Sequence, residues 1–141
     1  VPKDVIYNKG KGTFIILTTD NYINIYDKSF VRLSSTKITD GTGETLVAKM
    51  DASELNHAST STKIARVIYS INTTDPKGSV EILFDGTTNA TALFLAGQGT
   101  IDLQTSAIQI SNNASSPTGD ILFSTHNFVN GDSYSVILEV R

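Results

Sequence analysis

Short runs of alternating apolar and polar residues, separated by turn sequences, constrain this chain more than any other feature. Residues 133–140 read Ser-Tyr-Ser-Val-Ile-Leu-Glu-Val, and such period-two alternation of aromatic and β-branched residues is typical of a half-buried β-strand. The turn sequence Asn130-Gly131-Asp132 precedes it. Because Ile137 stands on the polar side of this strand, we expect that face to be partly covered as well.

The same unit recurs upstream. From residue 79 onward the sequence predicts about six short strands at spacings of roughly 10–15 residues, a spacing typical of a sandwich or barrel. The apolar runs lie at 80–84, 93–95, 101–103, 108–110, 121–123 and 134–140. All three prolines and all ten glycines are placed between predicted strands, and Gly97-Gln98-Gly99 is interpreted as a turn.

The first half of the chain is less regular. Residues 14–17 and 22–26 flank Asp20-Asn21 and predict a hairpin, and residues 30–33 extend its second strand or form a third. The stretch 44–75 lacks Gly and Pro, and the pattern favours strands at 45–51 and 63–72 joined by a Ser/Thr-rich link. A single helical turn at 51–56, capped by Asp51 or Ser53, is the alternative for the link.

These patterns predict an all-β protein, an antiparallel β-sandwich or a jelly-roll-like barrel with an extended N-terminal arm. The length of 141 residues suits one domain. We therefore divide the chain into an arm at 1–12 and a single β-sandwich domain at 13–141. Cysteine is absent, so neither disulfides nor thiolate metal sites support the fold.

The segment 1–12 contains few core candidates and three lysines. Residues 1–37 carry a net charge of +3 and the remainder −6, which is either chance variation between solvated faces or the mark of a basic segment that docks on an acidic neighbour. Under the second interpretation the arm adds a strand to a neighbour's sheet edge. The candidate partner-binding residues are Lys3, Val5, Ile6, Tyr7, Lys9 and Lys11.

Residues for catalysis are scarce. The two histidines, His57 and His126, are interpreted as exposed loop residues, and no serine lies in a G-x-S-x-G pattern. Glu81 and Glu139 fall in the middle of predicted strands, where a solvent-facing charge is expected rather than a paired acid for glycoside hydrolysis. We therefore predict that the chain is not an enzyme and contains no catalytic residues.

Two loops cluster oxygen ligands, at 40–44 and 85–89, but neither has the spacing of a calcium loop. They are interpreted as turns, and no metal ion, cofactor or small-molecule substrate is expected. The net charge of −3 and the lack of a basic stripe argue against nucleic acid. No apolar run approaches the roughly 20 residues that cross a bilayer, so no membrane partner is expected.

Four motifs in the second half resemble a known family. They are residues 79–93 (SVEILFDGTTNATAL), Gly97-Gln98-Gly99 followed by Ile101-Asp102-Leu103, residues 119–125 (GDILFST) and residues 131–141 (GDSYSVILEVR). This order of motifs is similar to that of small virion structural proteins of marine tailed phages, including cyanophages. The resemblance covers roughly residues 64–141.

The resemblance implies a virion component, most simply a capsid decoration (cement) protein on the outer surface of the assembled shell. Its implied partners are the major capsid protein and neighbouring copies of itself in a homodimer or homotrimer. Its location would be the capsid surface of the virion, after synthesis in the host cytoplasm. Two alternatives remain, a receptor-binding or fibre- or tail-associated β domain that recognises a host surface glycan, and a small polysaccharide hydrolase.

Overall fold

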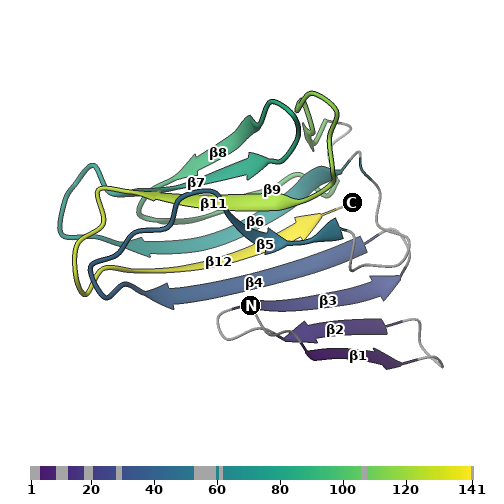
Figure 1. Cartoon of the computed structure of the whole chain (residues 1–141), viewed down its shortest axis with the longest axis horizontal. Coiled ribbons are helices and arrows are strands. Elements are labelled where there is room, and N and C mark those ends of the chain that lie inside the picture. Colours follow the sequence, from purple (N-terminus) through teal and green to yellow (C-terminus); the bar gives the residue numbers. More distant parts are fainter. Residues whose placement is uncertain are drawn as a thin grey trace.

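In the computed structural model the chain folds into two antiparallel β-sheets that pack face to face (Figure 1). The structure describes residues 4–8, 13–17, 21–27, 30–52, 60, 62–105 and 108–140, with side chains described from residue 35 onward. The prediction of an all-β sandwich is confirmed. The described residues contain no helix long and apolar enough to cross a membrane.

The larger sheet, sheet A, has eight strands. Its order begins β1-β2-β3-β4-β12-β6, after which both β9 and the short β10 pair with β6. The strand bounds are β1 (Asp4–Asn8), β2 (Thr13–Leu17), β3 (Asn21–Asp27), β4 (Phe30–Ile38), β6 (Lys63–Asn72), β9 (Gln98–Asp102), β10 (Ile110–Ser111) and β12 (Ser133–Val140).

The smaller sheet, sheet B, has the order β5-β11-β7-β8. Its strands are β5 (Val47–Met50), β7 (Ser79–Phe84), β8 (Ala90–Leu95) and β11 (Ile121–His126). From β4 onward the chain alternates between the sheets, apart from the β7–β8 hairpin and the short β10. The rows β4-β12-β6-β9 and β5-β11-β7-β8 have the strand order of a jelly roll.

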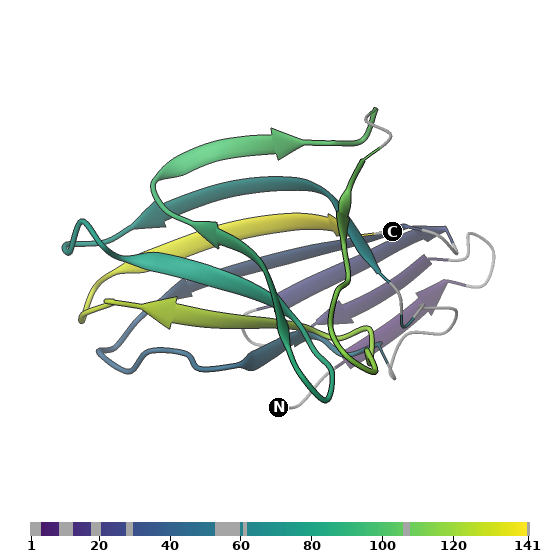
Figure 2. The same ribbon diagram turned by 90° about the horizontal axis from the view of Figure 1, so that it is seen from above.

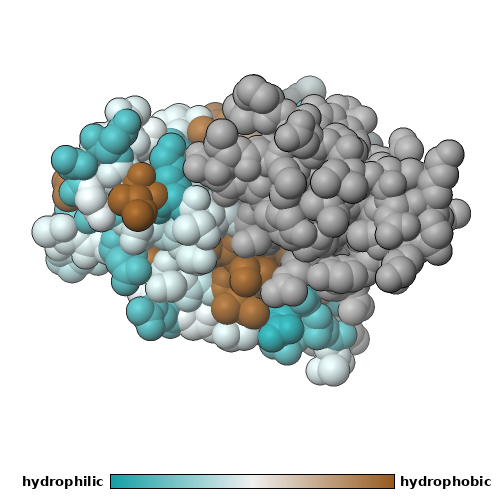
Figure 3. Space-filling model, turned by 90° about the horizontal axis from the view of Figure 1, so that it is seen from below, coloured by the Kyte–Doolittle hydropathy of each residue, from teal (hydrophilic) through white to brown (hydrophobic). Residues whose placement is uncertain are grey.

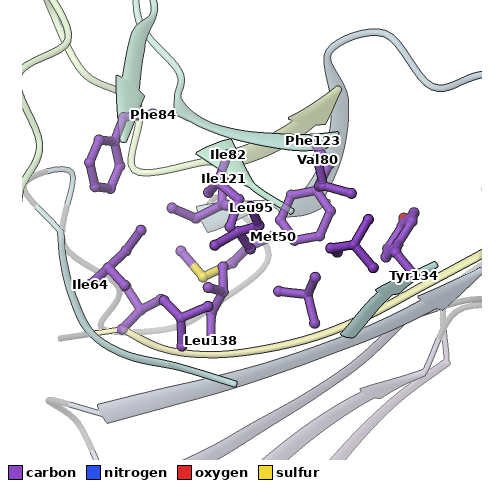
Figure 4. Close-up of a cluster of buried hydrophobic side chains, with 14 residues drawn as sticks. Met50, Ile64, Val80, Ile82, Phe84, Leu95, Ile121, Phe123, Tyr134 and Leu138 are labelled. Atoms are coloured by element: carbon purple, nitrogen blue, oxygen red, sulfur yellow. The ribbon is translucent and has the colours of Figure 1, made fainter. Parts of the chain in front are cut away.

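Alternation places the core between the sheets. The inward residues of β12 are buried, and so are those of β7, because every second side chain of a strand points to the same face. The largest fully buried side chains are Tyr134, Phe84, Phe123, Met50, Ile64, Ile82, Leu95, Ile121, Leu138 and Val67. All of them except Val67 are labelled in Figure 4.

The outer face of sheet A is mostly polar where its side chains are described, on the end of β4 and on β12, β6 and β9. Ile68 and Ile137 lie opposite each other on β6 and β12 and are half-buried, which agrees with the expected partial cover of this face. Thr36 and Ser135 are neighbouring exposed residues, and their hydroxyls are 3.3 Å apart. Figure 3, which views the molecule from below, accordingly shows small hydrophobic patches among hydrophilic residues.

The first three strands continue sheet A beyond β4 (Figure 1). The predicted hairpin is confirmed, because β2 pairs with β3. Within the segment predicted as an arm, Asp4–Asn8 forms β1 and pairs along its whole length with β2. Residues 1–3 and 9–12 of that segment lie outside the described residues.

One glycine prediction is wrong. Gly99 lies inside β9 and pairs with Tyr69 of β6, so only Gly97, with a φ of +68°, turns the chain at this point. A side chain at position 99 would start 2.8 Å from the Tyr69 hydroxyl. Glycine is therefore required inside this strand because a neighbouring ring approaches the backbone closely.

Candidate functional site

Four connections meet at one end of the sandwich, the left end in Figure 1. They are the β4–β5, β6–β7, β8–β9 and β11–β12 connections, and Figure 2 shows the same end from above. A groove with a volume of about 530 Å³ opens among three of them. This loop-end groove is lined by Ile71, Asn72, Thr73, Thr74, Pro76, Gly78, Ala96, Gly97, Gly131 and Asp132.

Asp132 ties two of these connections together. Its Oδ1 accepts hydrogen bonds of 3.0 Å from both the backbone N–H and the hydroxyl of Thr74. Its Oδ2 accepts a 2.8 Å bond from the backbone N–H of Val129. The walls of the groove are thus fixed by a carboxylate that is itself buried.

Further backbone contacts hold the groove. The N–H of Ile71 donates to the carbonyl of Gly97 at 2.7 Å, which joins β6 to the β8–β9 turn. Gly78 packs against Thr73 so closely that a Cβ at position 78 would lie 2.4 Å from the Thr73 side chain. Backbone hydrogen bonds and close packing at glycine thus hold this part of the groove.

The pKa of Asp132 predicts a pH-dependent stability. The hydrogen bond from the Val129 N–H lowers this pKa below its ordinary value of 3.8, and the bonds from Thr74 act in the same direction. Because the folded-state pKa is the lower one, the ionised carboxylate stabilises the fold above about pH 4, and this contribution is lost as the pH falls through the folded pKa.

We therefore expect Asp132→Asn to lower the melting temperature at neutral pH, since the amide nitrogen cannot accept the bond from Val129. The difference in melting temperature between this variant and the unchanged protein should shrink as the pH falls through the lowered pKa of Asp132. Melting curves recorded from about pH 7 to about pH 2.5 measure this difference. An equal difference at every pH would mean that the carboxylate charge is not what holds the loops.

Beside the groove, the outer face of sheet B carries an exposed aromatic side chain. Phe94 of β8 is 62% exposed. Its ring contacts the imidazole of His126, with ring centroids 5.7 Å apart. We call these two side chains the Phe94–His126 strip. Although His126 was predicted in a loop, it is the last residue of β11, and its side chain is 44% exposed.

Glu81 lies on β7, the strand between β11 and β8, and contacts both residues of the strip. It is the ladder partner of Phe94, and its Oε1 is 2.9 Å from Nε2 of His126. Its other oxygen, Oε2, accepts a short hydrogen bond from the Thr91 hydroxyl. Glu81 was predicted as a solvent-facing charge, but its side chain is only 14% exposed because its neighbours cover it.

An ion pair is buried inside the sandwich, apart from the groove and the strip. Lys49 and Glu44 form an ion pair with Nζ 2.5 Å from Oε2, and both side chains are almost fully buried. The Tyr134 hydroxyl donates to Oε1 of the same carboxylate. Lys49 Nζ also lies 6.0 Å from the centroid of the Phe123 ring. This cluster links Glu44 of the β4–β5 connection to β5, β11 and β12. Glu44 and Tyr134 also line a small pocket beside it.

A β-bulge explains why a lysine points inward here. Ile121 pairs with Met50 and Leu122 pairs with Ala48, so Lys49 is the extra residue between two ladder pairs. A bulge of this kind re-aims a side chain, and Lys49 and Met50 are consequently both buried.

The other charged candidates are held by protein partners. Glu139, predicted to face solvent, is only 8% exposed, and its Oε1 lies 3.7 Å from Nη1 of Arg66. In the two oxygen-rich loops, Asp40 accepts a 3.0 Å bond from the Thr42 N–H, and Asp85 accepts a 2.8 Å bond from the Thr118 hydroxyl. The Thr42 bond lowers the pKa of Asp40. Among the described residues no three metal-ligating side chains cluster.

The predicted partner-binding residues divide into two groups. Val5, Ile6 and Tyr7 lie in β1 and pair with Ile16, Ile15 and Phe14 of β2. Lys3, Lys9 and Lys11 lie outside the described residues. Partner binding by all six residues therefore stays a prediction. His57, which was predicted in a loop, also lies outside the described residues.

The sequence did contain a signal for the missed aromatic. Phe94 stands between Leu93 and Leu95, and in a strand the middle one of three successive side chains points to the opposite face from the other two. The groove had no such signal, since its residues are three separate turn sequences that only the strand order brings together.

Comparison of the chain with protein-family models, curated proteins and solved structures gives no match.

Proposed function

We propose that the chain is a non-enzymatic structural protein of a tailed-phage virion, a capsid decoration protein that binds the outer surface of the assembled shell and stabilises contacts between capsomers. The observation that carries this proposal is the position of β1, the outermost strand of an extension of sheet A beyond the sandwich. The resemblance of residues 64–141 to phage virion proteins supports it. Jelly rolls also occur in capsid domains, although they occur in lectins too.

An edge strand offers unpaired N–H and C=O groups to a second chain. Among the described strands β1 pairs only with β2, so its other side is the one that adds to the sheet edge of a capsid subunit. The basic residues at positions 3, 9 and 11 flank this strand in the sequence. They favour an acidic acceptor surface.

Such a protein would stabilise the shell by linkage. A ligand that binds only the assembled lattice stabilises it by RT ln(1 + [L]/Kd) at each site. If copies associate as dimers or trimers, several weak contacts combine through a high effective concentration. A single short strand per copy is then sufficient for durable attachment.

The test compares the full chain with a variant that lacks residues 1–12 on expanded, DNA-free shells of the parent phage. We expect the full chain to co-sediment with shells and to raise their disruption temperature, and the truncated variant to occupy markedly fewer sites. Circular dichroism should show that the sandwich of the truncated variant is intact. Unchanged occupancy would rule out the β1 docking role.

The second candidate is a fibre- or tail-associated domain that recognises a host surface glycan. The specific observation in its favour is the exposed Phe94 beside the loop-end groove.

A further inference from the structure

The Phe94–His126 strip and the loop-end groove are adjacent parts of one surface. Ala96 and Gly97 of the groove come two and three residues after Phe94 on the chain, and Gly78 of the groove precedes Ser79, the ladder partner of His126. Asn127, the residue after His126, donates from Nδ2 to the carbonyl of Lys77 in the β6–β7 connection at 3.3 Å. The end of sheet B is thereby fixed to the rim of the groove.

This surface combines one exposed phenylalanine ring with polar groups. The His126 imidazole and the Glu81 carboxylate lie beside the ring, and the groove adds the amide of Asn72 and the hydroxyl of Thr73. Both oxygens of Glu81 already accept one hydrogen bond from the protein. A carboxylate oxygen accepts more than one bond, so Glu81 is oriented and still able to receive donors from a ligand.

The groove adds acceptors and donors in a fixed arrangement. Thr73 and Asn72 lie along it, and its volume of about 530 Å³ falls within the range of roughly 300–1,000 Å³ that is usual for ligand sites. The carboxylate of Glu81 on this surface, and the buried carboxylate of Asp132 in the groove wall, disfavour an anionic ligand such as a phosphate, a sulfated chain or a nucleic acid.

We infer that this surface is a binding site for a neutral saccharide chain. A pyranose ring has an apolar C–H face and a rim of hydroxyls. The face packs on the exposed ring of Phe94, while hydroxyls donate to Glu81 and bond to the polar groups of the groove. The inference rests on the second candidate function, which it deepens, and it is independent of docking by β1.

The test is titration calorimetry of the full chain with a panel of neutral hexose oligosaccharides, alongside sialylated and sulfated ones. We expect binding to neutral members. Phe94→Ala should weaken it by about tenfold or more, because truncation of a central aromatic contact commonly costs over 1 kcal/mol. Phe94→Trp should preserve it, and Ala96→Trp, which fills the groove from an exposed position, should abolish it.

Ile38→Ala is the matched control, since Ile38 is a large apolar residue that is even more exposed than Phe94, at 73%, but lies on sheet A. It should leave saccharide binding unchanged. The inference is overturned if no neutral saccharide binds, if Phe94→Ala binds as the unchanged chain does, or if that variant instead dissociates a dimer or loses a peptide ligand.

Shell occupancy separates this inference from the proposed decoration role. Phe94→Ala should occupy shells normally, and the variant without residues 1–12 should bind saccharide normally. Failure of the saccharide site therefore leaves the shell result standing, and failure of shell binding leaves the saccharide result standing.

Discussion

Replacement of Phe123 by alanine is expected to lower the free energy of unfolding by about 3–5 kcal/mol, the usual cost of truncating a buried phenylalanine. Phe123 is fully buried in the middle of β11 (Figure 4). Its ring lies 5.9 Å from that of Tyr134 of the opposite sheet, so the truncation leaves a cavity between the two sheets. Since small domains are stable by about 5–15 kcal/mol in total, this variant should be close to unfolding.

Urea titration followed by circular dichroism measures this loss, because the chain contains no Trp for fluorescence. Phe94→Ala is the matched control on the outer face of sheet B, and it should change the free energy of unfolding by no more than about 0.5 kcal/mol. Equal losses in the two variants would contradict the assignment of inner and outer faces.

Replacement of Lys49 by methionine is expected to cost about 3–5 kcal/mol, because it leaves the buried carboxylate of Glu44 without its cation. Among the described residues, the Tyr134 hydroxyl is then the remaining hydrogen-bond donor to that carboxylate. The side-chain volume is nearly conserved, so the loss reports on the charge and not on packing.

The double variant Glu44→Gln with Lys49→Met separates these effects. Glutamine keeps an acceptor for the Tyr134 hydroxyl and removes the charge, so most of the stability should return, as is common when a buried ion pair is replaced as a whole. If the single Lys49 variant loses less than about 1 kcal/mol, or if the double variant is the less stable of the two, then the pair does not lie buried between the sheets.

The fold was largely predictable from alternation. Residues 79–141 were expected to form about six strands, and β7 to β12 are six strands. The strands at 45–51 and 63–72 correspond to β5 and β6. Alternation failed where a bulge or a neighbouring ring changes the backbone, as at Lys49 and Gly99, because these effects depend on the partner strand.

The candidate site was much less predictable. The position of Phe94 between Leu93 and Leu95 is a local signal for an outward side chain, but the contact between Phe94 and His126 crosses β7 and depends on the strand order of sheet B. Similarly, Asp132 was expected in a turn, and its bonds to Thr74 join segments 58 residues apart. Such long-range pairs carry no signal in a local pattern.

The proposed role assigns different tasks to different parts of the molecule. The β1 edge of sheet A is the attachment strand, the sandwich is a stable spacer, and the loop end with Phe94 is the recognition surface. A decoration protein that also binds neutral saccharides would present that surface outward while β1 contacts the shell.

The most direct test of the decoration role is an electron-microscopy map of the intact parent particle. The proposal predicts density for the sandwich at regular positions on the outer capsid lattice, between capsomers, with β1 on the side that contacts the shell. Density for the sandwich only at the tail or fibres, with none on the capsid lattice, would contradict it.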